Sequence, residues 1–289
     1  MTALFARGAL LFTALMLSTQ LHAEPDESQM VKKPVLELGA GFGMLAAPDY
    51  PGADEQTFLA LPFPYFVYRG ERLRAGRDGI KGLLYTGERL RLDISVGASL
   101  PVDSEDNSTR EGMDDLPPSL ELGPSLDWRL LDDGQNDVHF KFRLRALLAA
   151  DDGRIKHEGW VFNPMLNWDH RLNDRWQLNS RLMTFWGDQH YHDFFHGVDA
   201  SDATAQRPAY RGESGYGGSA IALGARWRPA PDWQLFARVS AYDFGGASFD
   251  DGPLFKQDDA LYFSLAITYI FWKSERQISI NSELEPVEP

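Results

Sequence analysis

Apolar and polar residues alternate one for one along much of this chain. The alternation is strictest over residues 138–147, where apolar positions alternate with His139, Lys141, Arg143 and Arg145. A period of two places the two sets of side chains on opposite faces of a β-strand. One face therefore suits hydrocarbon, whereas the cationic groups on the other face need partners if they are buried.

The same alternation recurs, and no connecting segment carries an apolar stripe of helical period, so we expect little helix. The pattern predicts strands at residues 35–46, 57–68, 72–77, 79–85, 88–100, 119–131, 137–149, 159–171, 175–187, 216–229, 232–244 and 260–272. Most of these exceed the ~5–6 residues of a strand in a globular sheet and match the ~9–11 tilted residues that cross a bilayer. Strand length therefore favours a membrane barrel over a soluble sandwich.

The connections sort by length. Long ones lie at residues 47–56, 101–118, 150–158, 188–215 and 245–259, and short turns lie at 69–71, 86–87, 132–136, 172–174 and 230–232. From residue 88 onward long and short connections alternate, as they do in outer-membrane barrels with short periplasmic turns and long external loops. The fold class predicted is all-β, a transmembrane antiparallel up-and-down β-barrel.

The number of strands depends on residues 72–85. If the chain breaks at Asp78-Gly79, this segment forms two short strands, the barrel has twelve strands, and both termini lie in the periplasm. Each half is short for a membrane span, so ten strands is the alternative. A barrel of twelve strands keeps every long loop on the external side.

Tryptophans provide a separate indication. Those near the short turns or at the end of the last strand are Trp128, Trp168, Trp176, Trp227, Trp233 and Trp272, and those near the long loops are Trp160 and Trp186. This distribution predicts two aromatic girdles at the membrane interfaces. The alternative is that these residues are ordinary core anchors.

The first residues differ from the rest. Arg7, the apolar run 9–17 and Leu21-His22-Ala23 have the form of a secretory signal peptide, residues 1–23. The alternative is a short membrane anchor, although the run is shorter than the ~20 residues of a spanning helix. We expect a periplasmic lead (24–34), a barrel (35–272) and a periplasmic tail (273–289), in the outer membrane of a Gram-negative bacterium with membrane lipid around it.

Composition narrows the possible partners and chemistry. The chain of 289 residues has no Cys and a net charge of −14, which becomes −15 without residues 1–23. The absence of Cys excludes a disulfide framework and thiolate metal sites. The negative charge argues against nucleic acid as a partner.

The polar faces of the strands predict a lumen lined by both signs of charge. The residues expected to line it are Arg91, Asp93, Glu121, Asp127, Arg129, Lys141, Arg143, Arg145, Asn167, Asp169, Arg181, Arg226 and Arg238. Opposite charges at similar heights would pair, with Glu121, Asp127 and Asp169 as the counter-charges of the basic strand. Mixed charge favours a filled or narrow lumen over a one-sign pore, but a porin or small-solute channel remains the rival function.

Candidate chemistry is sparse. His190, His192 and His196 are the best metal candidates, since His190 and His192 would share one face of an extended segment and Asp188, Asp193 or Asp199 could add oxygen ligands. A solvated or lumen-capping loop is the other interpretation. His139, His157 and His170 are scattered, and no Ser has the context of a nucleophile. We therefore expect no metal, no cofactor and no enzymatic activity.

Ordered motifs along the whole mature chain resemble the MipA/OmpV family of outer-membrane proteins. They are Gly39-Ala40-Gly41-Phe42-Gly43, residues 48–54 (PDYPGAD), residues 61–70 (LPFPYFVYRG), Tyr191 to Val198, Arg207-Pro208-Ala209-Tyr210, Gly215-Tyr216-Gly217-Gly218 and Asp251-Gly252-Pro253-Leu254. The resemblance implies a scaffold of murein synthesis whose partners are a lytic transglycosylase and a murein-polymerising penicillin-binding protein.

The sequence departs from usual barrels at its C-terminal end. Barrel proteins usually end on an aromatic residue of the last strand, whereas here Phe271 and Trp272 precede residues 273–289. Either Phe271 is an internal assembly signal or the tail makes a periplasmic contact.

Overall fold

The computed structural model describes residues 30–70, 73–76, 79–151 and 153–281. The predicted signal peptide, most of the predicted lead and residues 282–289 lie outside these ranges. The chain divides into two compact units, Met1–Met30 and Val31–Pro289, and the barrel lies in the second.

Strands dominate the described residues, as predicted. They are β1 (Met30–Pro34), β2 (Leu36–Pro48), β3 (Gln56–Arg69), β4 (Leu73–Gly76), β5 (Gly79–Thr86), β6 (Leu90–Ser99), β7 (Ser119–Asp132), β8 (Asn136–Asp151), β9 (Arg154–Arg171), β10 (Trp176–Gly187), β11 (Gly215–Ala230), β12 (Trp233–Asp243), β13 (Asp259–Lys273) and β14 (Gln277–Asn281). The helices are α2 (Gln189–His196) and a 3-10 turn, Ser104–Asp106. No helix in the described ranges is long and apolar enough to cross a membrane.

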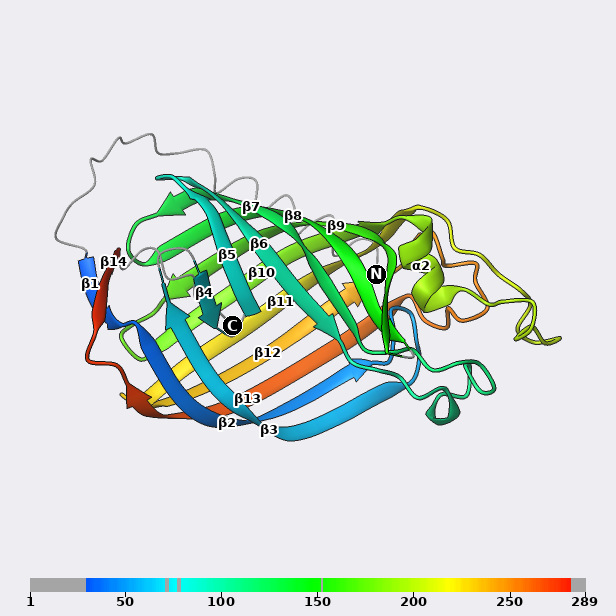
Figure 1. Ribbon diagram of the computed structural model, residues 1–289, viewed down its shortest axis with the longest axis horizontal. Coiled ribbons are helices and arrows are strands. Elements are labelled where there is room, and N and C mark those ends of the chain that lie inside the picture. Colours follow the sequence, from blue (N-terminus) through cyan, green and yellow to red (C-terminus); the bar gives the residue numbers. More distant parts are fainter. Residues whose placement is uncertain (1–29, 71–72, 77–78, 152, 282–289) are drawn as a thin grey trace. The chain divides into compact units, whose positions relative to one another are not determined.

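The strands β2 to β13 form one closed antiparallel barrel (Figure 1). Each strand pairs with its neighbours in sequence, and β13 pairs with β2 to close the wall. The twelve-stranded prediction is confirmed, and the ten-stranded alternative is wrong because the chain turns back between β4 and β5, where Gly76 pairs with Gly79. Both of these strands are short, as their sequences suggested.

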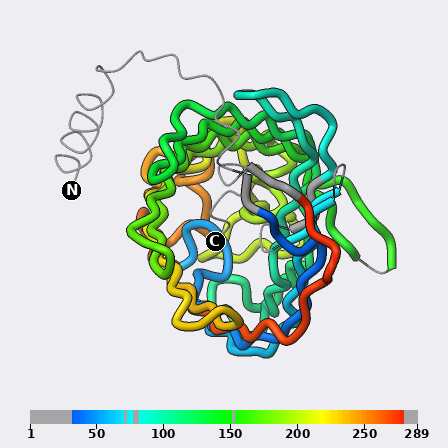
Figure 2. The backbone as a smooth tube through the Cα atoms, turned by 90° about the vertical axis from the view of Figure 1, so that its left-hand side faces the viewer, coloured from blue at the N-terminus to red at the C-terminus, as the bar shows by residue number. Residues whose placement is uncertain are grey.

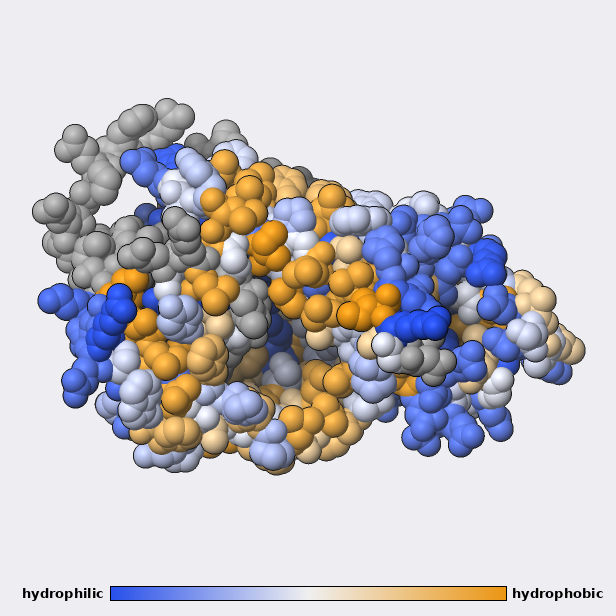
Figure 3. All heavy atoms as spheres, in the orientation of Figure 1, coloured by the Kyte–Doolittle hydropathy of each residue, from blue (hydrophilic) through white to orange (hydrophobic). Residues whose placement is uncertain are grey.

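The two faces of the wall differ in polarity. All eight tryptophans point outward, with exposed fractions between 37% and 49%, so they are not core anchors. Trp176 and Trp227 are cross-strand partners that stack with ring centroids 5.6 Å apart. On the face that Figure 3 shows, hydrophobic residues gather over the middle of the barrel and hydrophilic residues gather towards the ends, as expected for a membrane-spanning barrel.

Long loops and α2 fold over the external end of the barrel, and we call this assembly the cap (residues 49–55, 101–118, 188–214 and 244–258). The buried Tyr50, Leu147, Tyr191, Phe195 and Leu254 belong to one apolar cluster that joins the cap to the strands below it. The segment holding the three histidines was expected to be extended, and this expectation is wrong. Asp188 caps a helix there by accepting a hydrogen bond from the Tyr191 amide at 2.9 Å.

The opposite, periplasmic end carries the short turns and a separate two-stranded sheet formed by β1 and β14. Figure 2 shows these two segments side by side, although they come from opposite ends of the described chain. This sheet uses residues from both the predicted lead and the predicted tail.

Candidate functional site

The periplasmic half of the lumen contains a compact cluster of charges around Asp127. Arg91, Asp127 and Lys141 are cross-strand partners on β6, β7 and β8, so the register alone brings their side chains together. The Asp127 carboxylate lies 2.6 Å from Arg91 Nη2, 2.5 Å from His139 Nδ1 and 3.6 Å from Lys141 Nζ. His139 Nε2 also lies 2.7 Å from Asp137. Charges of opposite sign therefore fill this level of the lumen.

A second cluster connects the wall to the cap. Arg145 on β8 binds Glu121 on β7 at 2.7 Å, and its Nε donates to Ser95 Oγ on β6 at 3.1 Å. The Tyr191 hydroxyl of α2 donates to the other oxygen of Glu121 at 3.1 Å. Burial, followed by the charge of Glu121, raises the pKa of Tyr191 well above its usual range, so this hydroxyl stays a donor. Glu121 thus joins α2 to three strands.

The remaining residues of the predicted lumen network are distributed around the wall. Arg91 also lies 3.6 Å from Asp93, and Arg129 pairs with Asp132 at 3.2 Å. Arg238 donates to Asn179 at 3.0 Å. Further members are buried, namely Asn167, Asp169 and Arg226, or partly buried, namely Arg143 and Arg181. The contacts of these residues thus fall into several separate groups.

The histidines of α2 occupy two different environments. His190 is exposed, whereas His192 and His196 are buried one helical turn apart, on the face of α2 that packs against the other loops of the cap. His196 Nε2 donates to the Pro51 carbonyl at 2.7 Å, and its ring stacks on Phe249 with centroids 3.7 Å apart. Burial lowers the pKa of His196 to about 3, and burial also lowers the pKa of His192. Both rings are therefore neutral at physiological pH.

The surroundings of the α2 histidines are those of packed side chains and do not form a metal site. The carboxylates expected as co-ligands are used elsewhere, since Asp188 caps α2, Asp193 accepts from the Gly212 amide at 2.6 Å and Asp199 binds Arg211 at 2.7 Å. Within the described ranges, no group of three or more His, Cys, Asp or Glu is placed to hold a metal ion. His192 and His196 pack inside the cap, whereas His190 is exposed.

Sequence reasoning missed Arg110, which is buried at the centre of the cap. Its guanidinium donates to the Asp114 carbonyl at 3.0 Å and to the Phe195 carbonyl at 3.5 Å, and it lies 5.9 Å from the centroid of the Tyr50 ring. The Tyr50 hydroxyl donates to the Leu254 carbonyl at 3.0 Å. The conspicuous Tyr50-Pro51 pair was visible in the sequence, but its partners come from distant loops.

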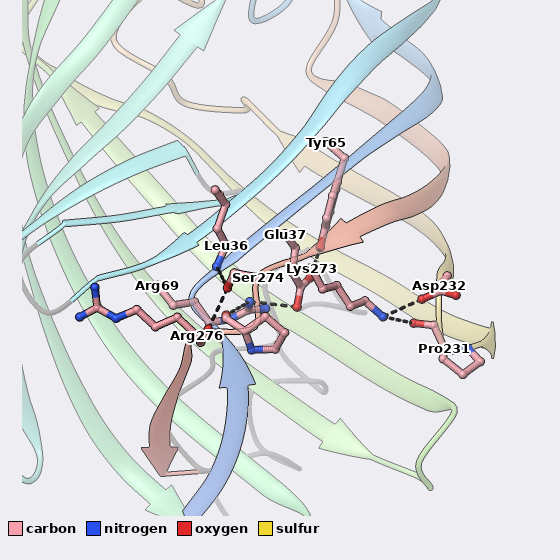
Figure 4. A network of polar contacts seen from close by, with 10 residues as sticks. Leu36, Glu37, Tyr65, Arg69, Pro231, Asp232, Lys273, Ser274 and Arg276 are labelled. Atoms are coloured by element: carbon pink, nitrogen blue, oxygen red, sulfur yellow. Dashed lines mark hydrogen bonds and ion pairs between the residues drawn. The ribbon is translucent and has the colours of Figure 1, made fainter.

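The periplasmic rim holds the β1–β14 sheet against the barrel through a set of polar contacts (Figure 4). Arg69 Nη1 lies 3.0 Å from both Glu37 and the Pro34 carbonyl, which anchors the end of β1. The Val35 amide donates to the Arg276 carbonyl at 2.9 Å, and the Leu36 amide donates to Ser274 Oγ at 3.1 Å.

On the same rim, Lys273 fixes the turn that precedes β12. Its ammonium lies 2.7 Å from Asp232 and 3.1 Å from the Pro231 carbonyl. Figure 4 shows these contacts and those of Arg69 along one edge of the barrel. The two described ends of the chain thus form, with the short turns, a structured periplasmic surface.

Comparisons with known proteins agree with this architecture. Residues 40–271 of the 289 match the family model described as MltA-interacting protein MipA. No curated protein matches the chain.

Three solved outer-membrane proteins resemble it distantly. An outer-membrane channel from Pseudomonas putida F1 is 13% identical, with 86% of this chain and 100% of that chain covered and a TM-score of 0.41. The toluene transporter TodX of Pseudomonas putida is 10% identical (81% and 89% covered, TM-score 0.37), and OmpT of Vibrio cholerae is 9% identical (84% and 100% covered, TM-score 0.38). At these TM-scores the likeness carries no argument about activity.

Proposed function

Since this chain belongs to the MltA-interacting protein MipA family, we propose that it is a non-catalytic scaffold that holds murein enzymes at the outer membrane. Its partners in this proposal are a lytic transglycosylase, which the family description names as MltA, and a penicillin-binding protein that polymerises murein. The barrel anchors the assembly in the membrane, and the periplasmic rim makes the contacts.

The observation that carries this proposal is the structured periplasmic surface. The sheet of β1 and β14 has only two strands, so within the described ranges each strand has a neighbouring strand on one side only. Such edges bind partners by adding a strand from the partner's chain. The contacts of Arg69 and Ser274 hold the sheet in place, so little conformational freedom is lost on binding.

The lumen side chains support a structural role in place of catalysis. Asp127, His139 and Glu121 are engaged in close ion pairs and hydrogen bonds within the wall. A catalytic acid or base must be able to reach a substrate, whereas these groups already contact protein partners.

A small-solute channel is the second candidate, and cavities inside the barrel favour it. One cavity of about 420 Å³ lies under the cap, and one of about 580 Å³ lies beside β3 and β12. Cap residues such as Tyr50 and Phe195 line the first cavity, and Arg238 lines the second.

Co-purification distinguishes the two candidates. The protein is extracted from cells in mild detergent and captured by a tag in an external loop, and bound murein enzymes are identified by mass spectrometry. The scaffold predicts a lytic transglycosylase and a penicillin-binding protein in the eluate, and their loss when residues 274–289 are deleted. The control variant Arg211→Ala, on the external side, keeps them. If no such partner is found and the protein gives reproducible conductance steps in planar bilayers, the channel function would be supported and the scaffold function rejected.

A further inference from the structure

Within the described ranges, the closed barrel is linked between β3 and β6 only through the short strands β4 and β5. On one side β3 pairs with β2 along its length, from Gln56 to Tyr68. On the other side, among the described residues, only Tyr68 and Arg69 pair with β4. The strand β6 likewise pairs with β7 up to Ser99 but with β5 only up to Ile94. Figure 1 shows β4 and β5 between β3 and β6. On the side of β4 and β5 that faces the cap, the edges of β3 and β6 face each other.

Two prolines keep the β3 edge unpaired. The Arg69 amide donates toward β2, to Val35, and the Gly70 amide donates toward β4, to Leu73. Because successive amides of a strand point to opposite sides and the β2–β3 register has no shift, even-numbered positions of β3 face the opening. Pro62 and Pro64 occupy two of these positions and have no N–H to donate. They prevent another strand from pairing there.

The prolines also suit an edge that faces hydrocarbon. An unpaired backbone N–H is costly in the bilayer core because no water is present to accept its hydrogen bond. Replacing two such donors by proline removes that cost at both positions. The neighbouring Phe58 and Phe66 are exposed on the same strand, with exposed fractions of 62% and 46%, and so belong to the lipid-facing surface.

Fixed structure frames the opening above and below. Above it, Asn107 Nδ2 donates to Asp49 at 2.8 Å, and the Ser108 amide donates to Glu55 at 3.0 Å, so the loop after β6 is tied to the loop before β3. Below it, β4 and β5 form the hairpin that completes the wall. The opening between Gln56–Val67 and Ser95–Ser99 is therefore a bounded window, and we use this name for it.

The window leads into apolar space. The cavity of about 420 Å³ is lined by Leu59 from one edge and by Ser99 and Leu100 from the other, and it reaches Tyr262 inside the barrel. The cavity of about 580 Å³ shares Leu59 and extends to Phe236. Figure 3 shows a hollow on this face of the barrel, with hydrophobic residues around it. Walls that are mainly apolar favour the binding of apolar ligands.

We propose that the window is a lateral port through which an acyl chain of the surrounding membrane lipid enters the lumen and occupies these cavities. The port opens into the membrane through the lipid-facing wall, whereas the cap packs against the strands at the external end of the barrel. The acyl chain is favoured over a polar solute because the rim of the window and both cavities offer mainly apolar side chains. This lipid site is independent of any periplasmic partner.

Photo-crosslinking tests this proposal. The protein is reconstituted in phosphatidylcholine vesicles that carry a diazirine at the end of one acyl chain, and cross-linked peptides are mapped by mass spectrometry after illumination. The port predicts cross-links on lumen-facing Phe236 and Tyr262 in addition to those on lipid-facing residues such as Leu223 and Leu261. Cross-links confined to lipid-facing residues would overturn it.

Obstructing variants make the result specific. Leu59→Trp and Ser99→Trp each place a large ring at one edge of the window, and each is expected to abolish the lumen cross-links while leaving those on Leu223. The matched control Ala225→Trp, on the lipid-facing side of β11, keeps both sets. Every variant is first checked for the mobility shift between unheated and boiled samples. Lumen cross-links that persist in both obstructed variants would contradict entry from the membrane. A free alkyl diazirine is used as a second probe, and lumen cross-links that form with this probe but not with the lipid would also contradict it.

Discussion

Replacing Asp127 by Asn tests whether the charge clusters hold the barrel together. The carboxylate is buried and sits between Arg91, His139 and Lys141 at 2.6, 2.5 and 3.6 Å. Asn has nearly the same shape but no charge, so the two cations are left facing a neutral amide. Two charge-assisted hydrogen bonds of ~1.5–3 kcal/mol each are weakened, and breaking a buried ion pair costs ~3–5 kcal/mol. We therefore expect Asp127→Asn to lower the free energy of unfolding by ~3–5 kcal/mol.

Urea unfolding of the protein folded into lipid vesicles, followed by tryptophan fluorescence, measures this change. The matched control is Asp174→Asn in an exposed periplasmic turn, which should stay within ~0.5 kcal/mol of the wild type. An Asp127→Asn variant as stable as the Asp174→Asn control would refute the reasoning, because it would mean that the cluster contributes no more than a surface carboxylate.

Three further predictions concern the cap and the wall. Because burial lowers the pKa of His196 to about 3, from 6.5 in the unfolded chain, the folded cap binds fewer protons between these values. The contribution of His196 to the stability of the cap is complete above pH 6.5 and falls by ~2 kcal/mol by pH 5, so protease cleavage of residues 199–214 should increase on acidification. His196→Phe should reduce this pH dependence to the part that His192, whose pKa burial also lowers, contributes. Tyr191→Phe removes the hydrogen bond to Glu121 and should loosen the cap by ~1 kcal/mol in the same cleavage assay at pH 7; unchanged cleavage would show that α2 does not depend on this bond. A Cβ on Gly123 would lie 2.0 Å from the Leu144 carbonyl oxygen, so Gly123→Ala should reduce the fraction that shows the heat-dependent gel shift, whereas Gly82→Ala, which meets only ordinary contacts at 3.9 Å, should not. Equal folded fractions for the two glycine variants would argue against close approach of β7 and β8.

Period-two patterning made most of the barrel predictable. The alternation of apolar and polar residues within each strand shows which of its faces meets lipid. The pairing of Asp127 with Lys141 then follows once β7 and β8 are aligned. The break between β4 and β5 was also visible, as Asp78-Gly79. These features are local, or they connect neighbouring strands through short turns.

Features that depend on distant segments were not predictable. The helix α2 is short. It is stabilised by the hydrogen bond that Asp188 accepts at its N-terminus and by the burial of His192 and His196 against other loops. Likewise, β1 and β14 contain no signal that they pair with each other. Pro62 and Pro64 were visible, but only the register shows that both face the same unpaired edge.

Direct binding measures the proposed scaffold most simply. The purified barrel, held in lipid nanodiscs, is titrated with a purified lytic transglycosylase of the MltA type, and the bound fraction is measured by calorimetry. We predict saturable binding that weakens strongly when residues 274–289 are deleted and is unchanged in Arg211→Ala. The absence of binding by the intact, folded barrel would contradict the proposal that its periplasmic rim holds murein enzymes at the outer membrane.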